Sequence, residues 1–470
     1  MARIIVVSNR VAVPSGDGGA RAGGLEVALR SFLKRHRGLW FGWSGRVAQK
    51  NDVKTHTVEQ AGVTYVTTDL SRVDHQEYYN GFANRMLWPI LHYRLDLMEY
   101  FSRDLNGYLR VNEQFATQLR ELIEPDDIIW VHDYHLLPLA KALRDRGVEN
   151  RIGFFLHIPF PPPHILTALP KHERVILSLC HYDLVGFQTD GDADNFARYL
   201  ADECRMPSRD PRTFIAGKRL VRIGAFPVGV ETAELNRLAR RTERSAFVRE
   251  VRHSLSDRPM IIGVDRLDYS KGIGLRIQAF ERFLADNPRW HSAVTYLQIT
   301  PRSRSEIAGY ADMERRIRES IGRVNGRYGE AAWTPIRYVN RPYSRSALAG
   351  LFRSSKVGLV TPLRDGMNLV AKEYVAAQDA DDPGVLILSR FAGAAVECQA
   401  ALLVNPYDPE AVGSTIAQAL AMPIDERRGR HDELYRVLSE NDIKFWGERF
   451  IEALTQPARP AVAWPDKLSA

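Results

Sequence analysis

The chain has 470 residues, and its 45% hydrophobic and 26% charged residues are typical of a globular protein. At about 100–200 residues per domain, this length predicts two or three domains. No apolar run approaches the roughly 18 residues that cross a bilayer. The three widely spaced cysteines, Cys180, Cys204 and Cys398, favour neither a disulfide framework nor a zinc site of the paired CxxC type. The N-terminus lacks the cleavage pattern of a signal peptide, so we expect a cytoplasmic protein with no membrane partner.

The net charge is 64 − 57 = +7 at neutral pH. A nucleic-acid-binding protein would concentrate this excess in one basic stripe with interleaved aromatic residues. Here the arginines are spread through amphipathic segments such as 234–254 and 305–323, with acidic residues between them. We therefore expect no nucleic-acid partner and instead a site for anionic small molecules.

Short apolar, β-branched runs alternate with longer helical patterns along the chain, as in parallel sheets that helices cover on both faces. This alternation predicts an α/β fold of two Rossmann-like, doubly wound parallel-sheet domains that face a cleft. The expected strands are 3–8, 39–43, 63–67, 127–132, 151–157, 183–187 and 221–226, followed by 260–264, 293–298, 336–340, 357–360, 385–389 and 401–405.

A break at about 227–258 separates the two series of strands. We expect an N-terminal domain over 1–232 and a C-terminal domain over 233–455, with an irregular tail over 456–470. A terminal helix near 441–454 could return to the N-terminal domain. Doubly wound sheets bind ligands beyond the carboxyl ends of their strands, so the expected site is the cleft between the domains.

In the first half, polar residues follow the strands. Ser8-Asn9-Arg10 ends the first strand, and Gly23-Gly24 opens a helix after a glycine-rich loop. Glycines at a helix start let a phosphate approach backbone N–H groups. A plain flexible loop is the alternative, because neither the P-loop pattern nor the GxGxxG spacing is present.

Two later strands end in the groups His132-Asp133-Tyr134-His135 and His157-Ile158. A carboxylate and an imidazole at adjacent strand ends would both face the cleft. The spacing of His132 and His135 could suggest a metal, but no third ligand is evident, and we expect His132 to be buried and hydrogen-bonded. Asp133 could also be the N-cap of a helix that begins at Tyr134.

In the second half, the segment DRLDYSKG places Arg266 and Lys271 on one loop after a strand. An arginine fork and a lysine charge suit a diphosphate, and a surface loop with unrelated charges is the alternative. Further on, TPLRDGMNLVAKE places Asp365 at a turn and residues 369–373 at a helix start, which favours phosphate. Glu373 could accept from sugar or ribose hydroxyls, or be an exposed first-turn glutamate.

These residues stand in longer motifs, among them SNR, LWFGWSG, YYNGFANRMLWP, WVHDYHLLPLA, RIGFFLHIPFP, DRLDYSKG and TPLRDGMNLVAKEYVAAQ. The motifs closely resemble those of trehalose-6-phosphate synthases, which are retaining glycosyltransferases of the two-Rossmann GT-B fold. The similarity extends from about residue 3 to 455 with the motifs in family order.

The resemblance implies roles for individual residues. Those that would bind the acceptor glucose 6-phosphate are Arg10, Tyr79, Trp88, Asp133 and Arg304. Those that would bind UDP-glucose are Gly23, Gly24, Arg266, Lys271, Tyr343, Asp365, Leu369, Val370, Ala371, Lys372 and Glu373. His157, Asp365, Arg266 and Lys271 would surround the bond that breaks, and Trp88 and Ile158 would set anomer selectivity. Tyr343 stands where some relatives carry phenylalanine near the uracil. No metal or other cofactor is implied.

The implied reaction joins UDP-glucose and glucose 6-phosphate into α,α-trehalose 6-phosphate, in a homo-oligomer for which a tetramer is one option. Front-side attack is the expected route to retention, and Asp365 as a covalent nucleophile is the less favoured one. Another GT-B sugar-phosphate glycosyltransferase, such as a sucrose-phosphate or glucosylglycerol-phosphate synthase, is the runner-up. An inactive nucleotide-sugar-binding regulator is disfavoured, because Arg266, Lys271, Asp365 and Glu373 are all present.

Overall fold

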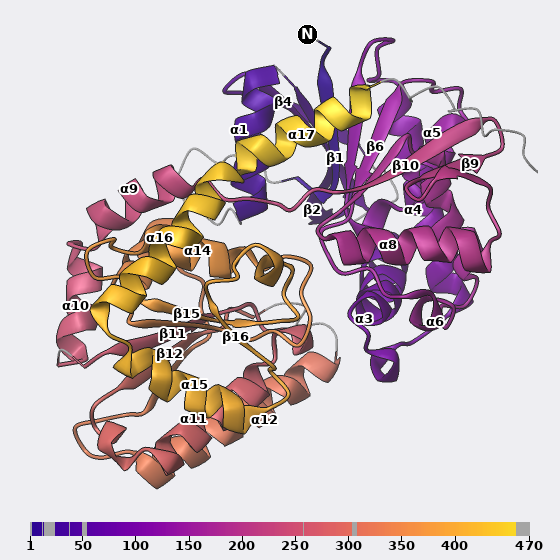
Figure 1. Ribbon diagram of the computed structural model, residues 1–470. Coiled ribbons are helices and arrows are strands. Elements are labelled where there is room, and N and C mark those ends of the chain that lie inside the picture. The colour runs from indigo at the N-terminus through magenta and orange to yellow at the C-terminus, as the bar shows by residue number, and fades with distance from the viewer. Residues whose placement is uncertain are drawn as a thin grey trace, which may run out of the picture. The chain divides into compact units, whose positions relative to one another are not determined.

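The computed structural model describes residues 2–11, 13, 24–36, 38–48, 54–256, 258–302 and 308–456. The chain forms two compact units, each built on its own sheet (Figure 1). The first unit comprises the chain up to Val11, Arg35–Phe226 and the segment from Gly447 onward. The second comprises Pro227–Trp446 together with the part of α1 (Gly24–His36) that ends at Lys34. The two-domain parallel-sheet prediction is confirmed.

The first unit holds a ten-stranded sheet in the order β3-β4-β2-β1-β5-β6-β7-β10-β9-β8 within its described residues. Its parallel strands are β4 (Val63–Leu70), β2 (Leu39–Val47), β1 (Ile4–Arg10), β5 (Ile128–His132), β6 (Arg151–Phe155), β7 (Leu184–Phe187) and β10 (Arg219–Ala225). Three antiparallel strands, absent from the sequence-based prediction, extend the sheet at its two ends. They are β3 (Thr55–Gln60) at one edge, and β9 (Thr213–Ala216) followed by the edge strand β8 (Ser208–Asp210) at the other.

Helices and helical turns connect these strands. The α-helices are α2 (Arg72–Asp74), α3 (Trp88–Leu91), α4 (Ser102–Arg120), α5 (Leu139–Arg144), α6 (Pro163–Leu166), α7 (His172–Ile176) and α8 (Asp190–Arg198). The segment His75–Leu87 winds as a π-helix, a rare form that is often found at functional sites. Short 3₁₀ turns cover Leu95–Leu97, Tyr134–Leu136 and Leu177–His181, and a second π segment covers Tyr199–Glu203.

The sheet of the second unit has the order β13-β12-β11-β14-β15-β16, and all its pairings are parallel. The strands are β11 (Met260–Val264), β12 (Thr295–Ile299), β13 (Ile336–Val339), β14 (Val357–Val360), β15 (Val385–Ser389) and β16 (Leu402–Val404). Counted along the chain, this is the 3-2-1-4-5-6 order of dinucleotide-binding domains, in which ligands bind where the order reverses.

Neighbouring residues of a strand point to opposite faces of a sheet. Because the residues of β11 and β12 are buried throughout, this sheet has a hydrophobic core on each face. Ile262 and Leu297 belong to one core, and Ile261 and Tyr296 to the other. Helices α9 (Thr232–Thr242), α13 (Arg345–Arg353), α14 (Leu369–Ala377) and α16 (Ile424–Glu440) contribute to the first core, whereas α11 (Ile273–Asp286), α12 (Ala308–Tyr328) and α15 (Pro409–Ala421) contribute to the second. Helix α10 (Ala246–Ser254) follows α9 (Figure 1).

The contact division between the units falls at Phe226, before the boundary at 232 that the sequence suggested. The reason is local bonding: the carbonyl of Val228 accepts from Lys372, and the hydroxyl of Thr232 donates to the carbonyl of Leu438. Both partners lie in the second unit.

The last helix, α17 (Ile443–Thr455), belongs to the first unit from Gly447 onward. Its buried Phe450 stacks on Trp130 of β5 with ring centroids 4.6 Å apart. Gly153 and Gly186 on the neighbouring strands make room for that ring, since a Cβ at either position would lie 2.7 Å from it.

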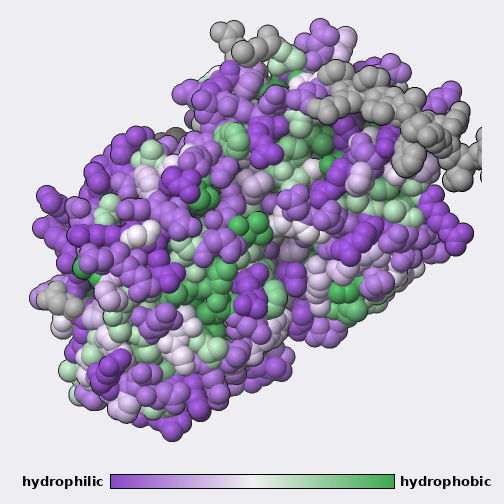
Figure 2. Space-filling view, viewed as in Figure 1, coloured by the Kyte–Doolittle hydropathy of each residue, from purple (hydrophilic) through white to green (hydrophobic). Residues whose placement is uncertain are grey.

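No described helix is long and apolar enough to span a membrane. The face of the molecule in Figure 2 is mostly hydrophilic, with smaller hydrophobic areas.

Candidate active site

In the second unit, the strand order reverses between β11 and β14. Two loops follow these strands, 265–272 and 361–368, and they lie against each other at the carboxyl edge of the sheet. The N–H of Leu363 donates to the carbonyl of Ser270 at 2.7 Å. Gly272 has a φ of +65°, and a Cβ there would lie 2.7 Å from the carbonyl oxygen of Thr361. The glycine is therefore required both by its backbone conformation and by the contact between the loops.

The expected diphosphate residues meet at this edge. The ammonium of Lys271 forms an ion pair with the carboxylate of Asp365, and both side chains are about one-seventh exposed, at 14% and 13%. Asn368 donates from its side-chain amide to the same carboxylate at 3.0 Å. Arg266 is exposed on the first loop. The site therefore presents two cations and a fixed carboxylate.

Helix α14 begins at this edge. Asn368 has a φ of 74°, and its side-chain oxygen accepts from the N–H of Ala371 at 3.2 Å. Leu369 and Val370 are the first two residues of α14, and the N–H groups of a first helical turn have no acceptor within their own helix. The helix dipole favours an anion at such N–H groups.

Two further residues of this turn differ in their surroundings. The ammonium of Lys372 is fully buried, donates to the carbonyl of Val228 at 2.7 Å and pairs with Glu397. The side chain of Lys372 is therefore part of the core. Glu373 is partly buried rather than exposed, and burial raises its pKa to about 7, while the charge of Arg345 opposes that rise.

Tyr343 follows β13, on the same carboxyl edge. Its ring packs against Phe247 at 5.4 Å, and its hydroxyl accepts from the guanidinium of Arg341 at 3.2 Å. The hydroxyl of Tyr343, which a phenylalanine would lack, is therefore hydrogen-bonded to Arg341 in this chain.

In the first unit, the strand order reverses between β1 and β5. Arg10 is exposed at the end of β1, with its guanidinium beside Gly45. Hydrogen bonds fix the two preceding side chains: Ser8 accepts from the indole N–H of Trp40 at 2.8 Å, and Asn9 accepts from the hydroxyl of Tyr78 at 2.8 Å.

Asp133 directly follows β5 and has an unusual backbone conformation, with φ 76° and ψ 164°. Only glycine adopts this region without strain, and such residues cluster at functional sites. Asp133 occupies the N-cap position of the turn Tyr134–Leu136, but its side chain makes no capping bond and accepts instead from the N–H of His157 at 3.3 Å. The simple capping interpretation is therefore wrong.

His132 and His157 form a hydrogen-bonded pair, with Nδ1 of His132 3.0 Å from Nε2 of His157. Burial lowers the pKa of His157 to about 3 and that of His132 well below its ordinary value. Both rings are therefore neutral at physiological pH, and the prediction that His132 is buried and hydrogen-bonded is confirmed. Ile158, the next residue after His157, is also buried.

Tyr79 lies between two imidazole rings, His75 at 5.5 Å and His135 at 5.9 Å, and is stacked on both. Trp88 is almost fully buried, with its ring 4.1 Å from that of His92. No group of three metal-ligating side chains occurs among the residues that the structure describes. Gly23 and Arg304 lie outside those residues, and Gly24 is the first residue of α1.

Two residues that hold the site were missed by sequence reasoning. Asn368 fixes Asp365 and caps α14, and the signal was available in the DGMN turn, since asparagine tolerates positive φ. Arg276 bonds to the carbonyl of Lys271, but in the sequence it is one more arginine of a helix.

The first unit carries its polar groups at the switch point of one doubly wound sheet, and the second unit carries cations and a helix N-terminus at the switch point of another. This arrangement defines an α/β protein of two parallel-sheet units, the second with the strand order of dinucleotide-binding domains. The model of glycosyltransferase family 20 matches residues 5–456, and the chain belongs to that family.

Similar proteins cover nearly the whole chain. A trehalose-6-phosphate synthase of Sinorhizobium fredii is 52% identical over 97% of this chain and 98% of its own length. A solved α,α-trehalose-phosphate synthase of Burkholderia xenovorans in complex with glucose 6-phosphate is 48% identical, with a TM-score of 0.94 over 97% of this chain and 100% of its own. A solved Escherichia coli relative, bound with UDP-2-fluoro glucose, is 46% identical, with a TM-score of 0.92 over the same shares.

Proposed function

We propose that this protein transfers glucose from UDP-glucose to glucose 6-phosphate with retention of configuration, forming α,α-trehalose 6-phosphate and UDP. The observation that carries this is membership of glycosyltransferase family 20 over residues 5–456. The named relatives and the ligands of their solved structures support it, as do the cations and the helix start at the second switch point.

The donor diphosphate would bind at that switch point. Arg266 and Lys271 supply positive charge, and the N–H groups of Leu369 and Val370 supply the dipole of α14. Negative charge develops on UDP as it leaves, and groups held in place before reaction stabilise that charge without reorganising. Glu373 would accept from the ribose hydroxyls.

The acceptor would bind through Arg10, Tyr79, Trp88, Asp133 and Arg304, with Trp88 and Ile158 selecting the anomer. The exposed guanidinium of Arg10 suits a phosphate, and the strained backbone of Asp133 supports a role for its carboxylate in binding. Because His157 is neutral, it would act as a hydrogen-bonding group near the donor glucose rather than as an acid.

Retention requires the acceptor hydroxyl to attack from the face that UDP leaves. In the proposed step, the bond from the anomeric carbon to the phosphate oxygen breaks, and the bond to the acceptor oxygen forms. The acceptor proton passes to the departing phosphate oxygen. Asp365 is a poor candidate for a covalent nucleophile, since Lys271 and Asn368 already hold its carboxylate.

The test is an assay of the purified protein with UDP-, GDP- and ADP-glucose against glucose 6-phosphate and other sugar phosphates, with products identified by NMR. Trehalose 6-phosphate with two α linkages, formed fastest from UDP-glucose, supports the proposal. A product from fructose 6-phosphate or glycerol phosphate instead would favour the sucrose-phosphate or glucosylglycerol-phosphate alternative.

We also propose a homo-oligomer in the cytoplasm. The three cysteines are free, as a reducing compartment requires, and both substrates are charged, water-soluble molecules. Light scattering of the purified protein and fractionation of the cells that make it test these two points.

A further inference from the structure

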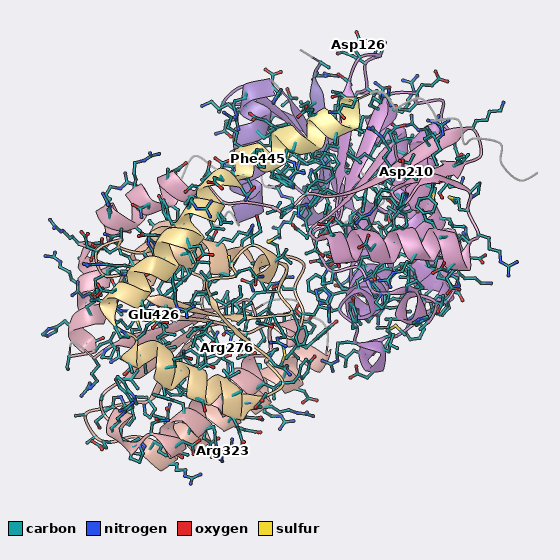
Figure 3. All side chains as sticks on the ribbon, viewed as in Figure 1. Asp126, Asp210, Arg276, Arg323, Glu426 and Phe445 are labelled. Atoms are coloured by element: carbon teal, nitrogen blue, oxygen red, sulfur yellow. The ribbon has the colours of Figure 1, made fainter. Side chains whose placement is uncertain are left out.

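Arg276, on α11, is fully buried beneath the switch point of the second unit. In Figure 3 it lies inside this unit, whereas Arg323 lies at its surface. A guanidinium presents five N–H donors in a rigid fork and stays charged, so it is buried only where acceptors surround it.

Among the residues that the structure describes, four acceptors bond to Arg276, and they come from different parts of the chain. Its Nε donates to the hydroxyl of Thr361 at 2.9 Å, and its Nη2 donates to the carbonyl of Lys271 at 3.1 Å. Its Nη1 donates to the carboxylate of Asp265 and, at 3.2 Å, to the side-chain oxygen of Gln298. One side chain therefore joins the ends of β11, β12 and β14 to the loop that carries Lys271.

The strand β11 is shaped for this cluster. A Cβ on Gly263 would lie 2.5 Å from the side-chain oxygen of Gln298 and 3.0 Å from Nη1 of Arg276. Glycine inside a strand weakens it, and here it leaves the space that the guanidinium needs.

Lys271 connects this buried cluster to the donor site. Its carbonyl is held by Arg276 while its ammonium is held by Asp365 on the facing loop. Thr361 is the first residue of that facing loop, and its hydroxyl accepts from the same guanidinium. The two loops also bond to each other directly, through the N–H of Leu363 and the carbonyl of Ser270. Arg276 adds a second connection between them from the buried side of the site.

We infer that Arg276 is a positioning residue for the donor diphosphate: it fixes Lys271 and the loop after β14 across the switch point without touching the substrate. The inference rests on the proposed function, because it assumes that a nucleotide diphosphate binds there. Lysine cannot replace arginine in this role, since one ammonium cannot reach both Thr361 and the Lys271 carbonyl as a fork does.

The test measures UDP binding by calorimetry in Arg276→Lys, Lys271→Ala and the double variant. Arg276→Lys keeps a cation near Asp265, and we expect UDP to bind about tenfold more weakly, with the KM for glucose 6-phosphate unchanged. If Arg276 acts through Lys271, the double variant should bind UDP within twofold of Lys271→Ala alone. The inference would be overturned if the double variant weakened UDP binding by the product of the two single effects. It would also be overturned if Arg276→Lys bound UDP with wild-type affinity.

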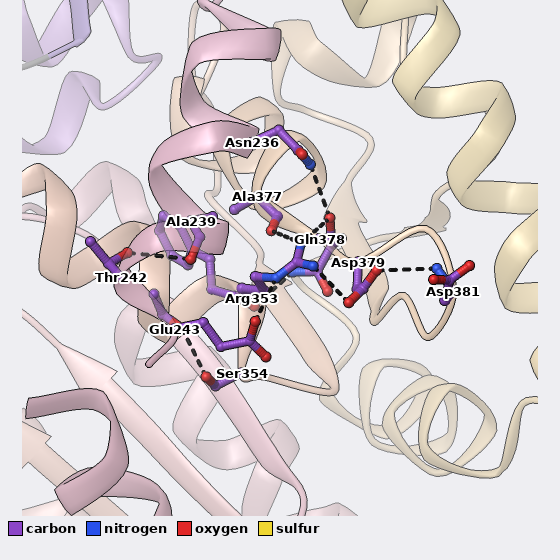
Figure 4. A network of polar contacts seen from close by, with 12 residues as sticks. Asn236, Ala239, Thr242, Glu243, Arg353, Ser354, Ala377, Gln378, Asp379 and Asp381 are labelled. Carbon is purple, nitrogen blue, oxygen red and sulfur yellow. Dashed lines mark hydrogen bonds and ion pairs between the residues drawn. The ribbon is translucent and has the colours of Figure 1, made fainter. Parts of the chain in front are cut away.

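Arg353→Lys is the matched control. Arg353 is another arginine of the second unit, with a side chain that is only 5% exposed, and it bonds to Glu243, Asp379 and the carbonyl of Gln378 (Figure 4). This variant should lose stability but keep the wild-type affinity for UDP. Equal weakening by Arg353→Lys would reduce Arg276 to a purely structural residue.

If Arg276→Lys does not fold, Thr361→Val removes one acceptor of the fork and keeps nearly the same side-chain shape. It should bind UDP about threefold more weakly, and unchanged binding would overturn the inference. Failure of the proposed function is distinguishable, because the wild-type protein would then neither bind UDP nor form trehalose 6-phosphate.

Discussion

Asp133 combines a side chain suited to binding with a backbone suited to glycine. The cost of a non-glycine residue in such a conformation is of order 1–3 kcal/mol. The surrounding structure maintains it: the N–H of Asp133 donates to the carbonyl of Phe155, and its carboxylate accepts from the N–H of His157. Strain retained directly after a strand of the first unit supports a functional role for the carboxylate.

We therefore predict that Asp133→Gly and Asp133→Ala both lose most of the turnover with glucose 6-phosphate, while their stabilities differ. Glycine relieves the strain that alanine keeps, so Asp133→Gly should be about 1–3 kcal/mol more stable than Asp133→Ala, as measured by urea unfolding. Equal stabilities would mean that the backbone relaxes around alanine.

The second prediction concerns Glu373, whose pKa is raised to about 7 by burial. An unfolded glutamate has a pKa near 4.3, so between about pH 4 and 7 the folded state holds a proton that the unfolded state has released. Stability from this group is therefore lost as the pH rises through that window. Glutamine cannot ionise, so Glu373→Gln should gain melting temperature over wild type at pH 8 and gain little at pH 5. A gain of the same size at both pH values would contradict the assignment.

At the scale of elements, α17 shows how one side chain attaches a helix to a sheet. Phe450 fills the space that Gly153 and Gly186 leave on β6 and β7. Phe445, on the same helix and labelled in Figure 3, is 41% exposed.

The third prediction compares these two residues. Phe450→Ala should destabilise the first unit by about 3–5 kcal/mol, because it leaves a cavity in a packed core, whereas Phe445→Ala should change stability by well under 1 kcal/mol. Hydrogen exchange of the β5 and β6 amides measures both. Faster exchange in both variants would point to a general loss of the helix instead of a lost core contact.

The elements also show where sequence patterns suffice. Each strand expected from an apolar run corresponds to a parallel strand of the structure. The strands that were not expected, β3, β8 and β9, pair antiparallel at the two ends of the sheet, and the edge strands β3 and β8 are almost entirely exposed. A strand that buries neither face leaves no hydrophobic run in the sequence, so it is recognised only through its pairing.

At the scale of the whole molecule, the fourth prediction is that turnover does not depend on a divalent metal. The proposed donor site already supplies Arg266, Lys271 and the N–H groups of α14 for the charge of the leaving diphosphate. Treatment with EDTA should leave kcat/KM within about twofold of the untreated enzyme. Loss of activity that Mg²⁺ or Mn²⁺ restores would require another source of charge at the diphosphate.

By itself, the sequence determined the two wound halves, the family and most of the residues at the strand ends. It could do so because buried parallel strands leave continuous apolar runs, and the polar residues that follow them come to one edge of the sheet. Only the tertiary structure decided that Lys372 and Trp88 are buried, that Asp133 is strained, and that Arg276 lies beneath the donor loop. Burial and hydrogen-bond partners depend on segments far apart in the chain, as Arg276 and Thr361 are, and no local pattern records such a contact.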